Sequence, residues 1–420
     1  MPLKFTPLLL RETSVLLGDV LTFAAPADSL LSGHFRHNPA LGREQRAFMA
    51  DSIFGVLRHL RTLQWQNAHA SPRLLLLLWL IRISGMSIRE LEPAMKKDEG
   101  RALAVLKAAA PSSPPLAVLA EWPDWVVEAL RPQYCEEEIL SLGRAMQNPA
   151  ALDLRVNTLK SNRETVLGEL AKLGLAASPT PYSPTGIRLA GHPDLVRLSL
   201  FKSGAIEVQD EGSQLIAILL GARRGEMVAD LCAGAGGKTL AIGALMASSG
   251  RLYAFDVNDK RLGKLAPRLK RSGLSNVTPQ LIASEQDSRL KRLAGKLDRV
   301  LVDAPCSGLG TVRRNPDLKY RHSRQSVAEL NQKQASLIRA AGKLVKPGGR
   351  LVYATCSLLS AENQTIAEVF LAEHPEFRLL PAGEVLASQR IPLTMGEYLE
   401  MDPVRHHTDG FFAAILERQR

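Results

Sequence analysis

Hydrophobic residues in the first third of the chain recur at helical spacing. The apolar positions of one such stretch are Phe48, Met49, Ile53, Val56, Leu57, Leu60 and Leu63. This i, i+3, i+4 spacing predicts a helix with one buried face. Residues 74–81 form an unbroken apolar run that is rich in leucine and poor in β-branched residues, which predicts a buried helix. The segment 111–115 contains three prolines and marks the first expected domain boundary.

A short α/β pattern follows this boundary. Apolar and polar residues alternate over 152–156, as in a half-buried strand. Ser161 and Glu164 have the spacing of a capping box, which predicts a helix start, and Gly174 predicts its end. A turn over 181–186 precedes another short apolar stretch. We therefore expect a small α/β module between two larger regions.

From about residue 209 onward, strand and helix patterns alternate. Strands are expected at 227–231, 252–256, 277–282, 300–303 and 350–355, and helices at 238–247, 260–271 and 327–345. This alternation predicts right-handed crossovers and a parallel, doubly wound sheet, whose ligands bind beyond the carboxyl ends of the strands. The expected protein is multidomain, with an all-α domain over 1–118, a small α/β module over 119–200 and a doubly wound α/β domain over 201–420.

Composition narrows the class of protein. The chain has 420 residues, of which 45% are hydrophobic and 23% charged, as in globular and not disordered proteins. Its longest apolar run has eight residues, too few to cross a bilayer, and residues 8–10 are too short for the core of a signal peptide. Four cysteines without a C-x-x-C pair indicate neither a disulfide framework nor a zinc site. We expect a cytoplasmic protein with no membrane partner and no metal.

Net charge adds a question that composition alone leaves open. Lys and Arg number 53 against 42 Asp and Glu, which gives a formal net charge of +11. Dispersed basic charge and a polyanionic partner such as a nucleic acid explain this excess about equally well.

A glycine-rich loop connects the first expected strand to its helix. The loop residues are Cys232, Ala233, Gly234, Ala235, Gly236, Gly237 and Lys238. The sequence Gly237-Lys238-Thr239 fits the end of a phosphate-binding P-loop, but Cys232 stands at the first glycine position and argues against an ATPase. The alternative is a nucleoside site, because glycines let the backbone approach a ligand closely.

An acidic residue supports the nucleoside interpretation. Asp256 ends the next strand, 20 residues after Gly236, where a carboxylate can accept hydrogen bonds from ribose hydroxyls. Asp256 can equally cap the helix that follows, and the two roles are compatible. A glycine loop with such an acid fits a dinucleotide or S-adenosylmethionine.

Two cysteines follow the last two expected strands. Cys306 lies in Asp303-Ala-Pro-Cys306, and Cys356 lies in Ala-Thr-Cys356. An isolated cysteine is usually a small buried hydrophobe, but neighbouring parallel strands would bring both thiols to one edge of the sheet, beside the nucleoside pocket. A thiolate that adds to C6 of a pyrimidine makes C5 nucleophilic toward a methyl donor, and a second acid/base group assists the later elimination. Asp303 could hold the edge of the base or orient the cofactor.

A basic run follows the first of these cysteines. Its cations are Arg313, Arg314, Lys319, Arg321 and Arg324. Beside a pyrimidine-modifying site, we expect these side chains to contact phosphates and Tyr320 to stack on a base.

Together these motifs resemble the Nop/Sun family of RNA cytosine-5 methyltransferases, in its RsmB-like branch. The resemblance is carried by residues 232–238, Asp256, 303–308, 313–317, 355–357 and 408–412. It implies a Rossmann-like class I methyltransferase domain that uses S-adenosylmethionine and no metal. The N-terminal helices resemble the NusB-like RNA-binding domain of that branch, and residues 154–158 resemble its small module.

The resemblance also implies a role for each site residue. The loop 232–238 would wrap S-adenosylmethionine, Asp256 would bind its ribose and Asp287 its adenine end, and Asp303 would lie between the methyl donor and the target base. Cys356 would be the nucleophile and Cys306 would assist release, a ranking that the residues alone leave open. Three departures stand out: Gly234-Ala235 replaces Ala-Pro, Asp287 lacks the usual preceding glycine, and Tyr320 replaces tryptophan.

The function implied is methylation of cytosine C5 in RNA, with small-subunit ribosomal RNA as the expected substrate. Its target should be a loop nucleotide or a base drawn out of the stack. The alternatives are a transfer RNA cytosine-5 methyltransferase and a noncatalytic RNA-binding assembly factor that keeps a methyltransferase shell. Nothing in the sequence indicates an obligate protein partner.

Overall fold

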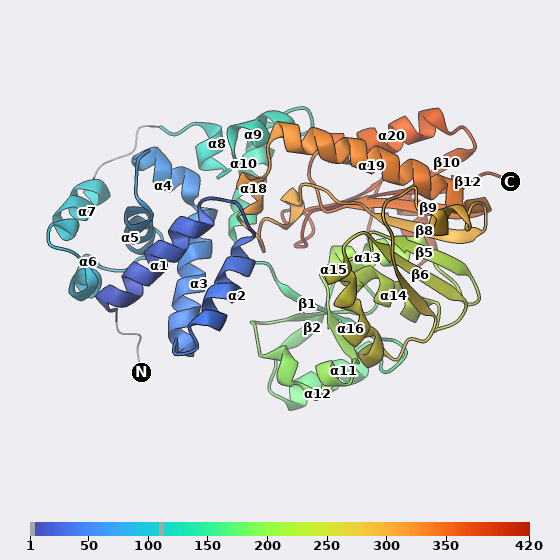
Figure 1. Cartoon of the computed structure of the whole chain (residues 1–420), viewed down its shortest axis with the longest axis horizontal. Helices are drawn as coiled ribbons and strands as arrows, with labels where there is room; N and C mark the ends of the chain where they lie inside the picture. The colour runs from blue at the N-terminus through green and yellow to red at the C-terminus, as the bar shows by residue number, and fades with distance from the viewer. Residues whose placement is uncertain (1–4, 109–112) are drawn as a thin grey trace. The chain divides into compact units, whose positions relative to one another are not determined.

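A computed structural model describes residues 5–108 and 113–420 (Figure 1). The first two residues of the expected boundary segment 111–115 lie outside the described residues. The chain divides into two compact units, Met1–Pro149 with Thr311–Arg324, and Ala150–Gly310 with Gln325–Arg420. In the described part of the chain, no helix is long and apolar enough to span a membrane.

The first unit is helical, which confirms the expectation for the N-terminal region. Its described α-helices are α1 (Pro7–Val20), α2 (Ala27–His37), α3 (Arg43–Arg58), α4 (Leu60–Gln66), α5 (Pro72–Arg82), α6 (Ile88–Leu91), α7 (Glu99–Ala108), α8 (Leu116–Leu119), α9 (Asp124–Leu130), α10 (Glu136–Gln147) and α18 (Leu318–Arg321). The stretch 48–63, expected as one helix, divides at His59 between α3 and α4. The apolar run 74–81 lies within α5, whose N-cap Ser71 accepts the N–H of Leu74.

The helices after residue 115 also pack in this unit. Glu121 follows α8, and its carboxylate accepts the backbone N–H groups of Arg61 (2.9 Å) and Thr62 (3.1 Å) at the start of α4. We expected linker helices within the segment 119–200, and the contacts of α9 and α10 group these two helices with the N-terminal ones. The three-domain division over 1–118, 119–200 and 201–420 stays a prediction.

Part of the basic run is built into the helical unit. The ring of Tyr320 stacks on Phe23 with centroids 5.1 Å apart. The Nζ of Lys319, which is 2% exposed, donates to the carbonyl oxygens of Arg58 (3.1 Å) and Glu121 (2.8 Å). The expectation that Tyr320 stacks on a base and Lys319 contacts phosphate is therefore wrong, because α18 packs these side chains against the helices.

Other cations of the run are engaged in the same unit. Arg321 lies 3.6 Å from the carboxylate of Asp317, Arg324 pairs with Glu128, and Arg313 is buried. Side chains of the basic run are therefore buried or ion-paired within the helical unit. The spacing of charges in the sequence does not predict this packing.

The second unit begins with a small antiparallel sheet. Its strands lie in the order β2-β3-β1-β4. The elements of this part are β1 (Leu152–Val156), α11 (Arg163–Lys172), β2 (Ala177–Pro179), β3 (Gly186–Leu189), α12 (Ser199–Lys202) and β4 (Ile206–Val208). The alternating stretch 152–156 is confirmed as β1. The predicted cap is displaced by one residue, because Asn162 and not Ser161 accepts the N–H of Thr165 (2.9 Å).

The larger sheet follows. Its elements are α13 (Glu211–Leu220), β5 (Met227–Leu231), α14 (Gly237–Leu245), β6 (Arg251–Asp256), α15 (Asp259–Gly263), α16 (Leu265–Ser272), β7 (Val277–Leu281), α17 (Ser288–Lys291), β8 (Leu297–Asp303), α19 (Arg324–Leu344), β9 (Val345–Thr355), α20 (Gln364–Glu373), β10 (Phe377–Leu380), α21 (Ala382–Ser388), β11 (Leu399–Met401) and β12 (Phe411–Arg418). The strand order is β10-β12-β9-β8-β5-β6-β7, and β11 pairs with β12. All five predicted strands are confirmed.

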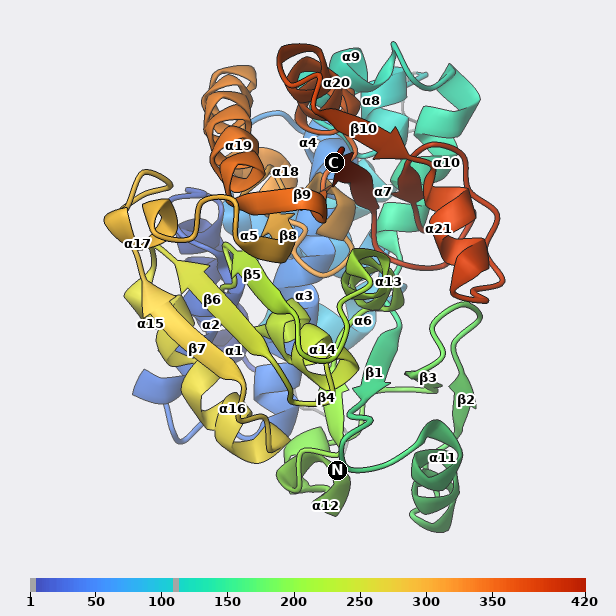
Figure 2. The same cartoon turned by 90° about the vertical axis from the view of Figure 1, so that its right-hand side faces the viewer.

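The sheet is mixed, which corrects the expectation of a parallel one. Strands β9, β8, β5, β6 and β7 run parallel and lie side by side in Figure 2. At the other edge, β12 pairs antiparallel with β9, and β10 and β11 pair antiparallel with β12. Strand β9 thus has β12 on one side and β8 on the other, so Cys356 follows an interior strand of the sheet.

Helices cover both faces of this sheet. Because side chains alternate along a strand, Val228 packs with Leu215 of α13 on one face, while Ala229 packs with Leu337 and Ile338 of α19 on the other. After β7 the chain crosses back to place β8 beside β5, so the strand order reverses between these two strands. In such sheets the crevice at this reversal is where ligands bind.

Candidate active site

A cavity of about 330 Å³ lies at the carboxyl ends of the parallel strands. Five predicted site residues line it: Cys232, Asp256, Asp303, Cys306 and Cys356. Its volume is at the lower end of the range for small-molecule sites. The structure therefore brings together residues that are more than 120 positions apart in the sequence, as the parallel sheet predicts.

The backbone of the glycine loop takes the left-handed conformation at several positions. The φ angles of Gly234 and Gly236 are +56° and +81°, and a Cβ on Gly236 would lie 2.1 Å from the Leu265 side chain. Cys232 also has a positive φ of +65°. Cys232 therefore adopts a backbone conformation that we expected only a glycine to take at the first position of a P-loop. This residue does not decide between a phosphate-binding loop and a nucleoside site.

The carboxylate of Asp256 holds this loop in place. One oxygen accepts the N–H of Gly234 and the other the N–H of Asn258, each at 2.7 Å. Asp256 is only 5% exposed. Each carboxylate oxygen has two lone pairs, so Asp256 can bind a ligand hydroxyl without giving up the loop.

Lys238 forms an ion pair with Asp303, which lines the cavity. The Nζ of Lys238 donates to the Oδ2 of Asp303 at 2.8 Å and lies 5.7 Å from the centre of the Phe411 ring. Burial acts against the charge of Lys238, but the nearby Asp303 raises its pKa above the ordinary value. The lysine is thus a fixed cation beside the thiol-bearing loops.

The two thiols face each other across neighbouring strand ends. Strands β8 and β9 pair with Asp303 opposite Ala354. The Sγ atoms of Cys306 and Cys356 lie 3.4 Å apart, and both cysteines are free. The hydrogen bond between the thiols, together with burial, raises the pKa of Cys306 well above its usual value.

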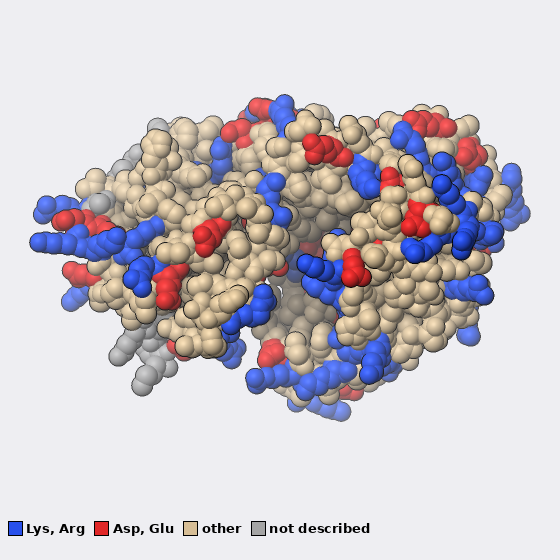
Figure 3. Space-filling model, in the orientation of Figure 1, with Lys and Arg blue, Asp and Glu red and all other residues tan. Residues whose placement is uncertain are grey.

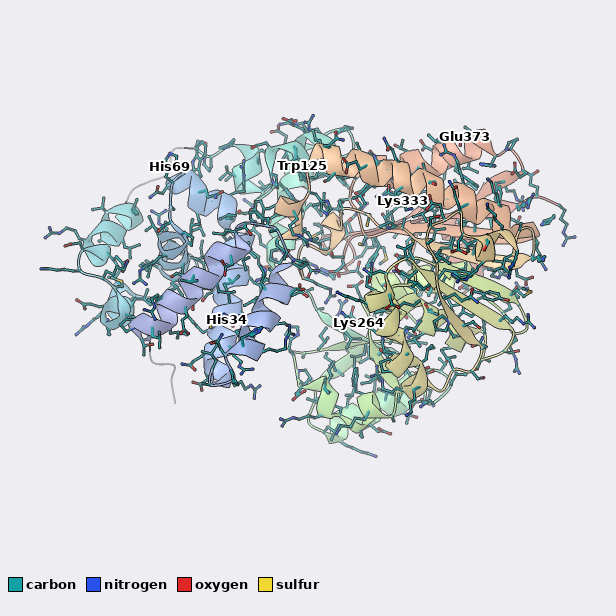
Figure 4. The ribbon with its side chains drawn as sticks, in the orientation of Figure 1. His34, His69, Trp125, Lys264, Lys333 and Glu373 are labelled. Atoms are coloured by element: carbon teal, nitrogen blue, oxygen red, sulfur yellow. The ribbon has the colours of Figure 1, made fainter. Side chains whose placement is uncertain are left out.

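The structure does not bring Asp287 to the cavity. Its carboxylate caps α17 by accepting the N–H groups of Arg289 (2.9 Å) and Ala283 (3.0 Å). The residue that lines the cavity in this segment is Glu285, which pairs with Lys333. Lys333 lies on α19 (Figure 4). The missing glycine before Asp287 was the sequence signal that this assignment was weak.

Glu285 is ionised. Burial acts to raise its pKa, but hydrogen bonds from Lys333 and Ser336 outweigh this effect and lower the pKa to about 2. Asp287 fixes the turn before α17 by accepting backbone N–H groups on both sides of it, and Glu285 in the same turn lines the cavity.

Two further buried acids lie behind the site, and sequence reasoning missed both. Asp230, the second-last residue of β5, accepts the Thr239 hydroxyl at 2.6 Å, and burial raises its pKa to about 7. Glu362 accepts hydrogen bonds from Ser307 and Ser357, the residues that follow the two cysteines. Neither acid lines the cavity.

The described residues offer no clustered metal ligands, and the charge on the visible surface is mixed in sign. Among the described residues, no group of three or more His, Cys, Asp and Glu side chains is placed to hold a metal ion. Lys and Arg side chains are spread over much of the face seen in Figure 3, with Asp and Glu side chains between them.

Comparison with known proteins identifies the type of site. Residues 217–417 match the family model described as 16S rRNA methyltransferase RsmB/F, and residues 122–195 match a ferredoxin-like domain of RsmF/B-like methyltransferases. The probable ribosomal RNA small subunit methyltransferase B of Synechocystis is 37% identical over 71% of this chain and 67% of its own. The ribosomal RNA small subunit methyltransferase B of Sodalis glossinidius is 31% identical over 90% of this chain and 91% of its own.

A solved structure extends the similarity to the fold. The crystal structure of PH0851 has a TM-score of 0.80 and 28% identity, and the match covers 99% of this chain and 100% of that one. The matching family model and the two relatives named above are methyltransferases, which argues further against the ATPase interpretation of the glycine loop.

Proposed function

Because the chain belongs to the RsmB/F family of 16S rRNA methyltransferases, we propose that it transfers a methyl group to C5 of a cytosine in small-subunit ribosomal RNA. The observation that carries this proposal is the 3.4 Å approach of the Cys306 and Cys356 sulfurs at the cavity that Cys232, the first residue of the glycine loop, also lines. Neither a dinucleotide oxidoreductase nor a binding module requires two thiols at this position.

S-adenosylmethionine fits the residues of the cavity. A Cβ at Gly237 would meet no atom within 4 Å, so the loop backbone is open to close approach there, and the buried carboxylate of Asp256 has lone pairs free for ribose hydroxyls. Glu285, and not Asp287, lines the cavity together with Asp256, so Glu285 is the second carboxylate that can accept hydrogen bonds from the cofactor. When bound, the cofactor supplies an electrophilic methyl group.

The chain's own residues account for the chemistry at the base. The Cys356 thiolate forms a bond to C6 of the cytosine, and the electron pair of the C5–C6 double bond moves toward C5, which becomes nucleophilic. Once C5 is methylated, its proton leaves to a base, and the C6–S bond breaks to return its electron pair to sulfur. The family resemblance assigns the attack to Cys356 and the elimination step to Cys306, whose sulfur lies 3.4 Å from that of Cys356.

In this proposal, the helical unit and the net positive charge of the chain serve RNA binding. The cytosine must leave its stack before C5 and C6 can reach a recessed pair of thiols. The resemblance to NusB-like domains assigns RNA binding to the helical unit, and the net charge of +11 supplies attraction for phosphates. The buried Lys319 and Tyr320 are not part of that surface.

The proposal is tested by incubating the protein with S-adenosylmethionine and either 16S ribosomal RNA or transfer RNA. Nucleoside mass spectrometry should detect 5-methylcytidine in the 16S RNA, and Cys356→Ala should abolish it. 5-Methylcytidine in the transfer RNA alone would show that transfer RNA, and not 16S ribosomal RNA, is the substrate. Absence of 5-methylcytidine in both RNAs would favour the noncatalytic assembly factor.

A further inference from the structure

One buried carboxylate joins the two loops that carry the thiols. The Oε1 atom of Glu362 accepts the backbone N–H of Ser307 at 2.8 Å. Its Oε2 atom accepts the hydroxyls of Ser307 and Ser357, each at 2.5 Å. Ser307 follows Cys306 and Ser357 follows Cys356, so a single side chain holds both loops from behind.

Glu362 is itself fixed on several sides. It is 0% exposed, and the Nε2 of Gln334 on α19 donates both to its Oε1 (3.0 Å) and to the carbonyl of Pro305 (2.9 Å). The hydroxyl of Tyr353 donates to the Glu362 backbone carbonyl at 2.6 Å. Because packing and hydrogen bonds fix its acceptor atoms, Glu362 can set the separation of the loops that donate to them.

The two loops depend on Glu362 to different degrees. The Cys356 loop has other anchors: the side-chain amide of Asn363 donates to the Ser357 carbonyl (3.1 Å), and the Leu359 N–H donates to the Ser357 hydroxyl (3.1 Å). Ser307, beside Cys306, directs both its N–H and its hydroxyl to Glu362. Loss of the carboxylate should therefore displace Cys306 more than Cys356.

Stability alone is a poor explanation for this arrangement. Burying a carboxylate is costly even when it is hydrogen-bonded, and an apolar side chain of similar volume often packs as well or better. Charge-assisted hydrogen bonds are short and directional, so they fix geometry more tightly than apolar packing does.

Resting on the proposed function, we propose that Glu362 is a positioning residue that sets the distance between the two thiols. It touches neither the base nor the cofactor, because it lies behind the loops and does not line the cavity. Its effect is on the step that needs both thiols: with Cys306 displaced, Cys356 still adds to the base, but release of the methylated product slows.

The variant Glu362→Gln tests this role with little change in shape. It replaces one acceptor oxygen by an NH₂ group, so either the two serine hydroxyls at Oε2 or the Ser307 N–H and the Gln334 amide at Oε1 lose their acceptor. A misplacement of about 1 Å can cost on the order of 100-fold in rate. We expect turnover to fall at least about tenfold and the ratio of trapped protein–RNA adduct to methylated product to rise about tenfold.

Glu226→Gln is the matched control. Glu226 pairs with Arg299 (2.7 Å) just before the amino end of β5, away from the thiols. Its loss should lower the melting temperature and leave the adduct-to-product ratio unchanged. An unchanged ratio in Glu362→Gln, at any level of turnover, would overturn the positioning role.

A second measurement needs no catalysis. Phenylarsine oxide binds two adjacent thiols, forming two As–S bonds with release of water. In a Cys232→Ala background, which removes the third thiol of the cavity, Glu362→Gln and Glu362→Ala should bind it about tenfold more weakly than the background protein. Equal affinity would contradict the positioning role. If the arsenical result holds and the parent protein makes no 5-methylcytidine, the proposed function fails and the role in thiol spacing stands.

Discussion

Gly310 is the position where an added methyl group should disturb the thiols most. It lies four residues after Cys306, and its N–H donates to the Cys356 carbonyl at 2.9 Å. Its own carbonyl accepts the Gly410 N–H at 2.8 Å. Gly310 thus links the loop of one cysteine to the loop of the other and to the segment that leads into β12.

The magnitude of the disturbance follows from the space available. A Cβ on Gly310 would lie 2.2 Å from the Gly410 carbonyl oxygen and 2.8 Å from the Cys356 carbonyl oxygen. Both are backbone atoms, and ordinary contact begins near 3.4 Å, so the segments must separate by about 1 Å. A shift of that size near reacting groups costs roughly 100-fold in rate, and overpacking costs about 1–3 kcal/mol of stability.

Gly310→Ala should therefore lower the rate of 5-methylcytidine formation about 100-fold, measured with saturating cofactor and RNA. Gly168→Ala is the control, because a Cβ there meets nothing within 4 Å and Gly168 lies within α11 of the small module. It should keep full activity and gain about 0.5–1 kcal/mol in stability. Full activity of Gly310→Ala would refute the claim that the spacing of these loops controls the rate.

Three further changes have defined outcomes. The pKa of Asp230 is raised by burial to about 7 from an ordinary value of 3.8, so its stabilising contribution is fully present below about pH 4 and is lost as pH rises through 7; this amounts to roughly 4 kcal/mol. Asp230→Asn should remove that pH dependence in denaturant unfolding between pH 4 and 8, and an unchanged slope would contradict it. Glu121→Ala leaves the N–H groups of Arg61 and Thr62 without their acceptor and should cost about 1–3 kcal/mol, seen as a lower melting temperature; an unchanged melting temperature would count against it. Asp256→Ala frees the glycine loop and removes the ribose acceptor, so calorimetry should show S-adenosylmethionine binding at least about tenfold weaker, and unaltered affinity would exclude this role.

The residues that the sequence predicted best are those at strand ends. Asp256, Asp303, Cys306 and Cys356 each follow a strongly apolar strand, and parallel strands bring such ends to one edge whatever the details of packing. The glycine loop was found for the same reason, since its position between a strand and a helix determines where it lies.

The residues that were misplaced depend on contacts between distant segments. Tyr320 and Lys319 belong to a basic run in the sequence, and only the packing of α18 against Phe23 and Glu121 buries them. Asp287 and Glu285 are two residues apart, and the turn before α17 decides which one reaches the cavity.

Two features lacked a usable local signal. The antiparallel edge arises because β12 pairs with β9. The hydrophobic periodicity of a strand does not show whether it runs parallel or antiparallel to its neighbour. Glu362 has an ordinary sequence environment, and its importance comes from two serines that meet it in space, one of them 55 residues away.

The most direct test of the account is to locate the covalent bond to RNA. Cys306→Ala should accumulate a protein–RNA adduct in the presence of S-adenosylmethionine, and peptide mass spectrometry should place the attached nucleotide on Cys356. Cys356→Ala should form no adduct and no 5-methylcytidine. An adduct on Cys306, or normal methylation by both variants, would contradict the claim that these two thiols act together on one cytosine.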